Sequence, residues 1–153
     1  MVYFFIIASS FIFIPNERFK VKKDFNIYMA KEVFEIDYVI KASPKILYDF
    51  VKQPTHLAQW FCDKCESNLD RYNFIWKGYS ESAVLIDDIE DELVAYHWEN
   101  SEEDEFFEFA IQVNEISEDT ILTINDFAET NEIEDQKMWW DNQIQKLIRV
   151  MGG

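Results

Sequence analysis

Apolar and polar residues alternate along residues 34–40, and this pattern predicts the first strand of the chain. All four even positions of this range are apolar, whereas Glu35 and Asp37 are charged. An apolar residue at every second position places one face of a strand against a core and leaves the other face in solvent. We therefore expect a half-buried strand here.

A Ser-Pro pair follows this strand and predicts the start of a short helix. Ser43 can cap the helix, and Pro44 suits its first position, where no backbone donor is needed. Apolar residues then recur on one helical face, at Ile46, Leu47, Phe50 and Val51. After a second break, the segment LAQWF at residues 57–61 predicts another short helix.

Alternation returns after residue 70 and predicts an antiparallel meander. Turn residues interrupt it at intervals of roughly 8–12 residues, as is typical of consecutive antiparallel strands. The expected strands cover residues 72–76, 82–89, 93–99, 106–113 and 121–126. The acidic tract at residues 100–105 is expected to form a solvated loop between two of these strands.

A long amphipathic helix is predicted over about residues 131–151. Its apolar stripe consists of Trp140, Ile144, Leu147, Ile148 and Met151. Asn131 and Glu134 form a candidate capping box, and Gly152 suits the helix end. The order of strand, two short helices, five strands and long helix predicts an α+β domain, in which a curved antiparallel sheet wraps around the C-terminal helix. Side chains that do not fill the space between helix and sheet would leave a cavity there.

Residues 1–28 differ from the rest of the chain. An apolar run at residues 2–14 is followed by Pro15 and a basic stretch, and it is shorter than the roughly 20 residues that span a bilayer. We favour a hydrophobic leader outside the fold, with Met29 as the native start and a domain over residues 29–153. A signal or anchor and an added strand or helix on the domain are the alternatives.

Composition and charge indicate one globular domain with an acidic surface. Hydrophobic residues make up 48% of the 153 residues, which supports one packed core. The formal net charge is −16, and residues 1–28 carry +2, so the remainder carries −18. Such a surface repels phosphate backbones and anionic lipids, so we expect neither nucleic acid nor a membrane as a partner. A basic protein partner is the alternative to a merely solvated surface.

The two cysteines, Cys62 and Cys65, form one C-x-x-C motif at the end of the second short helix. A structural zinc site needs four ligands, and the sequence holds no second cysteine pair. We expect two ordinary thiols and no metal or cofactor. A redox or metal role is the alternative.

The sequence carries no motif for nucleophilic, phosphate-binding or dinucleotide chemistry, so no catalytic residue is assigned. His97 is expected at the surface of the strand at residues 93–99, and His56 is expected to be solvated. Asp126 is expected to point inward near the end of its strand. A buried carboxylate is costly and is often functional.

The predicted cavity between helix and sheet has seven candidate lining residues. These are Trp60, Trp76, Trp98, Phe109, Asp126, Trp140 and Ile144. Large aromatic side chains bury much area, so simple core packing is the alternative to a ligand-binding wall. We expect Phe106 and Trp139 to be exposed. Exposed aromatic side chains are favourably buried in an interface, so these two residues favour a homodimer.

Several segments resemble the START-like (helix-grip, SRPBCC) superfamily. They are FEIDYVIKASPKILYDFV, LAQWF, EFFEFAI, TILTINDFAE and the terminal DQKMWWDNQIQKLIRVMGG. The likeness covers residues 30–153 and is to the group related to the activator of the heat-shock chaperone ATPase, and within it to small bacterial START-like proteins without an assigned activity. The resemblance implies a helix-grip fold, a hydrophobic cavity and a cytoplasmic protein.

Three functions are compatible with this sequence, and we rank them in the following order. The first is non-enzymatic binding of a small hydrophobic ligand in the cavity between helix and sheet. The second is an acidic protein-interaction module accessory to a chaperone. The third is an enzyme of the cyclase or hydrolase kind, which would need a polar group such as His97 or Asp126 inside the pocket.

Overall fold

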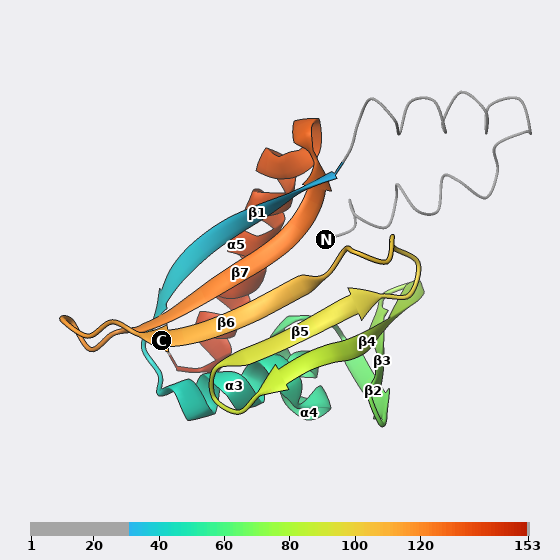
Figure 1. Ribbon diagram of the computed structural model, residues 1–153. Coiled ribbons are helices and arrows are strands. Elements are labelled where there is room, and N and C mark those ends of the chain that lie inside the picture. Colours follow the sequence, from blue (N-terminus) through green and yellow to red (C-terminus); the bar gives the residue numbers. More distant parts are fainter. Residues whose placement is uncertain (1–30, 153) are drawn as a thin grey trace, which may run out of the picture.

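The computed structural model describes residues 31–152, which form one seven-stranded antiparallel sheet with helices packed against it (Figure 1). The strands are β1 (Lys31–Ile40), β2 (Lys64–Asn68), β3 (Arg71–Trp76), β4 (Tyr79–Ile89), β5 (Leu93–Trp98), β6 (Phe107–Val113) and β7 (Thr120–Glu129). The helices are α3 (Pro44–Lys52), α4 (Pro54–Trp60), the 3₁₀ turn η1 (Thr130–Glu132) and α5 (Ile133–Val150). The predictions for residues 1–28 and for Met29 as the native start lie outside the described residues.

The first predicted unit is confirmed. β1 ends before Ser43, whose hydroxyl accepts a hydrogen bond from the backbone N–H of Ile46 at 3.4 Å. Pro44 is the first residue of α3, as expected for a proline that loses no needed donor. The apolar face of α3 then buries Leu47 and Val51 completely.

The meander is confirmed, with one strand more than predicted. The sheet order is β1-β7-β6-β5-β4-β3-β2, so β1 and β2 are its edges. β2 was missed because its sequence, KCESN, is polar, and most of its side chains are exposed. An edge strand of this kind lacks the apolar alternation that identifies half-buried strands.

The predicted capping box of the last helix is wrong. The chain passes from β7 directly into η1, which contains Asn131, and α5 begins only at Ile133. Glu132 is the N-cap residue and makes no capping hydrogen bond with its side chain. Because no loop separates strand and helix, the chain tightens into a 3₁₀ turn instead of the extended conformation that a capping serine or asparagine adopts.

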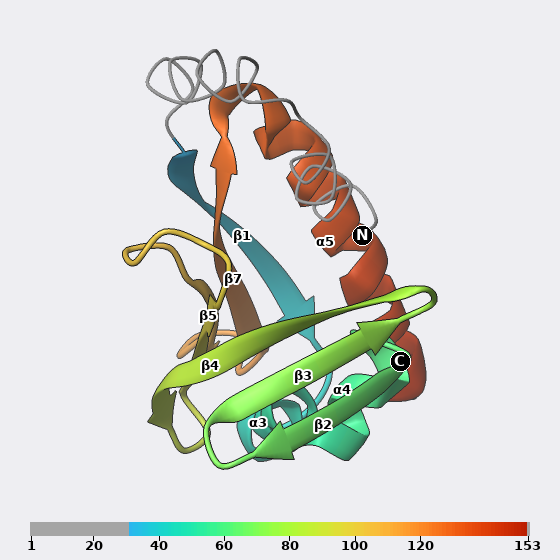
Figure 2. The ribbon, with the colours of Figure 1, turned by 90° about the vertical axis from the view of Figure 1, so that its right-hand side faces the viewer.

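The sheet is strongly curved and holds α5 against its concave face. In Figure 2, β3 and β4 in the lower part of the sheet run at a large angle to β1 and β7 in the upper part, and α5 lies to the right of β1 and β7. α5 contacts β1, β7 and α4, while α3 packs on β5 and β6. The register of β4 against β5 shifts between Leu85 and Asp87, and such a bulge increases local bend and twist. The predicted helix-grip arrangement is thus confirmed.

The apolar stripe of α5 forms one side of the core. Ile144 and Leu147 are fully buried, and Trp140 nearly so. The Tyr38 hydroxyl on β1 donates to the Asp141 carboxylate on the exposed side of α5 at 2.6 Å, which fixes the helix to the sheet edge. Within residues 31–152, no helix has both the length and the apolarity needed to cross a membrane.

Candidate ligand-binding interior

The structure brings all seven predicted cavity residues into one buried cluster. They come from α4, β3, β5, β6, β7 and α5: Trp60, Trp76, Trp98, Phe109, Asp126, Trp140 and Ile144. Ring centroids of neighbouring members lie 5.8–6.5 Å apart, as for Phe109 with Trp140 and Trp76 with Trp98. These side chains therefore form a continuous, mainly aromatic interior between α5 and the sheet.

Phe61, which the sequence analysis did not single out, lies at the centre of this interior. Its ring centroid lies 5.0–6.0 Å from the rings of Trp60, Phe74, Trp76, Phe107, Trp139 and Trp140. Its backbone carbonyl accepts one hydrogen bond from Trp76 Nε1 and another from Gln143 Nε2, both at 3.0 Å. Phe61 thus joins the end of α4 to both β3 and α5.

Asp126 is the buried carboxylate of the interior, as predicted. Its Oδ2 accepts from Trp140 Nε1 at 2.9 Å and from Gln136 Nε2 at 3.2 Å, and its Oδ1 accepts from the backbone N–H of Phe127 at 2.8 Å. Burial raises the pKa of this carboxyl to about 6, and the three hydrogen bonds oppose that rise only in part. Gln136 is buried as well, which its residue type did not indicate.

Trp139 is buried, so the prediction that it is an exposed aromatic is wrong. It neighbours Trp140 on α5, with ring centroids 4.7 Å apart, and also contacts Phe61. Its indole Nε1 is inaccessible to solvent and has no hydrogen-bond acceptor among residues 31–152. Phe61 at the end of α4 covers this side of the helix: its ring contacts Trp139, and its carbonyl oxygen accepts from Gln143, so both residues are enclosed beside the central stripe.

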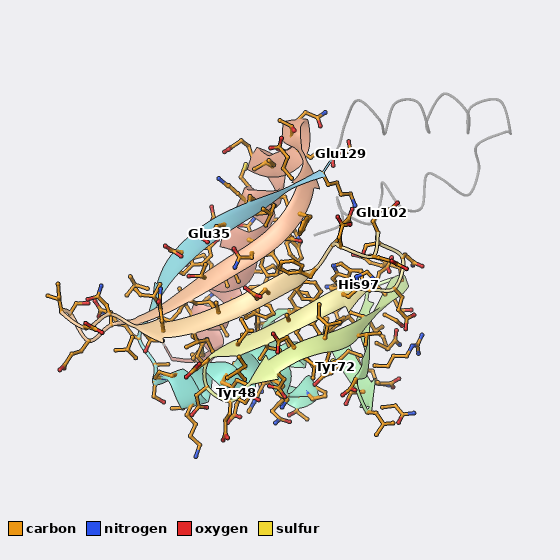
Figure 3. All side chains as sticks on the ribbon, viewed as in Figure 1. Glu35, Tyr48, Tyr72, His97, Glu102 and Glu129 are labelled. Carbon is orange, nitrogen blue, oxygen red and sulfur yellow. The ribbon has the colours of Figure 1, made fainter. Side chains whose placement is uncertain are left out.

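The two histidines lie outside the interior. His97 is half-buried on β5, and its Nδ1 is 2.7 Å from the backbone carbonyl oxygen of Glu105. Figure 3 places it at the end of the sheet that carries the acidic loop with Glu102. His56 is partly buried rather than freely solvated, because its ring stacks on Phe50 with centroids 4.4 Å apart. Neither ring reaches Asp126 as a partner in acid–base chemistry.

Cys62 and Cys65 are free thiols at the junction between α4 and β2. Cys62 is buried, and Cys65 is partly exposed. In the part of the chain that the structure describes, no three His, Cys, Asp or Glu side chains gather closely enough to hold a metal ion.

A family model described as the START-like superfamily domain matches residues 28–153. No curated protein matches the chain. Among solved structures, BfR322 from Bacteroides fragilis is 31% identical to this chain, covers 80% of it and 93% of its own length, and superposes with a TM-score of 0.60.

Two other solved structures share the fold at lower sequence identity. The Aha1 dimer from Colwellia psychrerythraea is 16% identical, with a TM-score of 0.66 over 76% of this chain and 93% of that one. Protein MLL2253 from Mesorhizobium loti is 15% identical, with a TM-score of 0.65 over 79% of this chain and 97% of that one.

Proposed function

Because this chain belongs to the START-like superfamily, we propose that it is a non-enzymatic module that binds a small, mainly apolar ligand between α5 and the sheet. START-like domains commonly bind hydrophobic ligands. An interior walled by aromatic side chains, with few polar groups, suits a ligand that is largely apolar and has one polar end. We infer a cytoplasmic location from membership of the START-like superfamily.

The observation that carries this proposal is the indole N–H of Trp139, which has no acceptor in the part of the chain that the structure describes. A buried donor without an acceptor costs about 1–3 kcal/mol. A ligand with a carbonyl or hydroxyl oxygen would supply the missing acceptor. The protein would recover the cost of the buried donor upon binding, which adds to the affinity for such a ligand.

A non-enzymatic role also agrees with the hydrogen bonds of Asp126 and the position of His97. Both oxygens of Asp126 already accept hydrogen bonds from protein donors, and three donors surround the carboxylate. A general base needs access to a substrate proton, and His97 instead lies against the carbonyl oxygen of Glu105 on a different part of the sheet.

Native mass spectrometry of protein purified from cells tests the proposal directly, because a tightly held ligand appears as an added mass. Titration with Nile red, a neutral fluorescent dye with a carbonyl oxygen, provides a Kd for the purified protein. A protein that carries no added mass and does not bind Nile red would contradict ligand binding.

We expect Trp139→Phe to weaken Nile red binding about fivefold, because it removes one hydrogen-bond donor worth about 1 kcal/mol but keeps an aromatic ring. The stability of the unliganded protein should change by less than about 1 kcal/mol, because relief of the unpaired buried donor offsets the packing lost with the smaller ring. Met138→Leu, at the exposed neighbouring position, is the matched control and should leave Kd unchanged. Equal Kd values for Trp139→Phe and the parent protein would reject the indole as the recognition group.

The negative charge of the protein also disfavours an anionic ligand. Above pH 6 the Asp126 carboxyl is mainly ionised, and the chain carries a net charge of −16, so an anionic ligand would meet repulsion both inside and outside. At pH 7.5 we expect decanol to displace Nile red at about one-tenth of the concentration that decanoate requires. Displacement at equal concentrations would show that ligand charge plays no part in selection.

A second function, an acidic protein-interaction module accessory to a chaperone, is favoured by the net charge and by the fold shared with Aha1. Charge of one sign selects a basic surface on a partner and makes binding sensitive to salt. A chaperone complex that forms in size-exclusion chromatography at low salt and dissociates at high salt would favour this role. The Colwellia structure is a dimer, but of the two aromatic residues that suggested a homodimer here, Trp139 is buried and Phe106 is half-buried rather than exposed.

A further inference from the structure

We propose that Cys62 and Cys65 form a reversible dithiol–disulfide couple that exchanges with small disulfides such as oxidised glutathione. The two residues are separated by two positions and lie on either side of the junction between α4 and β2. This proposal does not rest on the proposed ligand binding.

The strand pairing places Cys65 on the inner side of the sheet edge, and Cys62 lies in the core cluster against which Cys65 packs. Cys65 pairs with the fully buried Phe74 across β2 and β3, so both side chains lie on the same face of the sheet. Cys65 is partly exposed because β2 is an edge strand, whereas Cys62 is buried at the end of α4. A small disulfide can therefore reach Cys65 first, and Cys62 is positioned behind it.

The two thiols also interact with each other. Hydrogen bonding with Cys65, followed by burial, raises the pKa of the Cys62 thiol well above its ordinary value. The Cys62 thiol donates weakly to the Leu57 carbonyl oxygen, with the sulfur 3.7 Å from that oxygen. Cys62 thus stays protonated in the reduced protein and is the poorer first nucleophile of the pair, and it can attack in the second step only after it loses its proton.

The exchange balances in two steps. The Cys65 thiolate attacks one sulfur of oxidised glutathione, the glutathione S–S bond breaks, and one glutathione thiolate leaves. Cys62 then releases its proton to water, and its sulfur attacks the Cys65 sulfur of the mixed disulfide, which expels the second glutathione thiolate. The protein loses two protons and two electrons, and oxidised glutathione is reduced to two molecules of glutathione.

The position of the two cysteines next to Phe61 connects their oxidation to the packing of the aromatic core. Cys62 directly follows Phe61, whose carbonyl oxygen holds both Trp76 and Gln143. Closing the disulfide removes the hydrogen bond from the Cys62 thiol to Leu57 and constrains the backbone next to that carbonyl. Oxidation should therefore change the intrinsic tryptophan fluorescence of the protein, and reduction should reverse the change.

The test uses the full chain in glutathione redox buffers, with thiols trapped by N-ethylmaleimide and masses read by mass spectrometry. We expect a monomer that has lost two hydrogen atoms and takes up no maleimide, and that dithiothreitol restores fully. Cys62→Ala should stop the reaction at the mixed disulfide on Cys65 and prolong its lifetime by about a hundredfold or more, because the resolving thiol acts at high effective concentration. Cys65→Ser, at the more exposed position, should form no internal disulfide and, as a buried thiol alone, little glutathione adduct.

Two results would overturn the proposal. One is a parent protein in which glutathione stays on Cys65 while Cys62 still reacts with maleimide after unfolding. The other is a Cys62→Ala protein whose mixed disulfide is no longer-lived than that of the parent. Circular dichroism of each variant shows that the fold is kept, and the result for the parent protein does not depend on any substitution.

Discussion

Phe61→Ala is expected to destabilise the protein by about 3–5 kcal/mol, the range for removing a large aromatic side chain from a packed core. Phe61 is fully buried, and its ring packs against aromatic side chains from α4, β3, β6 and α5. The cavity would open where these elements meet, so no single element can move to fill it. A loss of this size is a large share of the roughly 5–15 kcal/mol that stabilises a typical domain.

Urea unfolding followed by far-UV circular dichroism measures this effect without relying on the tryptophans around Phe61. Phe61→Leu keeps most of the volume and should cost less, about 1–2 kcal/mol, which gives a value even if the alanine variant does not fold. Phe106→Ala is the matched control, because Phe106 is half-buried and packs on Phe127 outside the main cluster, with ring centroids 5.1 Å apart. Equal losses for Phe61→Ala and Phe106→Ala would show that Phe61 has no central role.

Much of the fold followed from local patterns because each pattern has a local physical cause. The Ser43 cap and Pro44 fix the start of α3, and alternation identifies strands that have one buried face. Trp140 and Ile144 on the predicted stripe are buried because a stripe of helical period must face the core. In each case the signal lies within a few residues of the structure it specifies.

The features that were missed depend on partners far away in the chain. β2 has no apolar face of its own and exists because β3 lies beside it. Phe61 ends a short helix, and only the convergence of β3, β6 and α5 makes it central. Gln136 and Gln143 are buried because Asp126 and the Phe61 carbonyl accept their N–H groups, and residue type alone predicts glutamine at the surface.

The candidate site shows the same division. Alternation in β7 correctly placed Asp126 inside, since Leu122 and Ile124 on the same face are fully buried. The sequence did not show that Trp140 and Gln136 would be its donors, because these residues approach only when α5 docks on the sheet. Burial disfavours the ionised form of this carboxyl group and so lowers the stability of the folded protein. Residues that lower stability in this way are concentrated at functional sites.

The raised pKa of Asp126 leads to the second large prediction. The free energy of unfolding should depend on pH, and Asp126→Asn should remove the part of this dependence that Asp126 contributes. The pKa of Asp126 is about 6 in the folded protein, above its ordinary value of 3.8. The folded state therefore binds this proton more tightly than the unfolded state. The resulting stabilisation is fully present below pH 3.8 and is lost as the pH rises through 6. The complete span corresponds to about 3 kcal/mol at 1.36 kcal/mol per pKa unit.

Other carboxyl groups also titrate in this range, so the measurement is a difference between two proteins. The free energy of unfolding of the parent minus that of Asp126→Asn should rise by about 2 kcal/mol when the pH falls from 7 to 4. Asp135→Asn makes the same change in formal charge at an exposed position of α5 and controls for the effect of net charge. If the difference for Asp126→Asn stays constant to within about 0.5 kcal/mol, burial does not disfavour the charged carboxylate. The carboxylate would still be ionised at pH 7.5 in that case, so the expected discrimination between decanol and decanoate does not depend on this result.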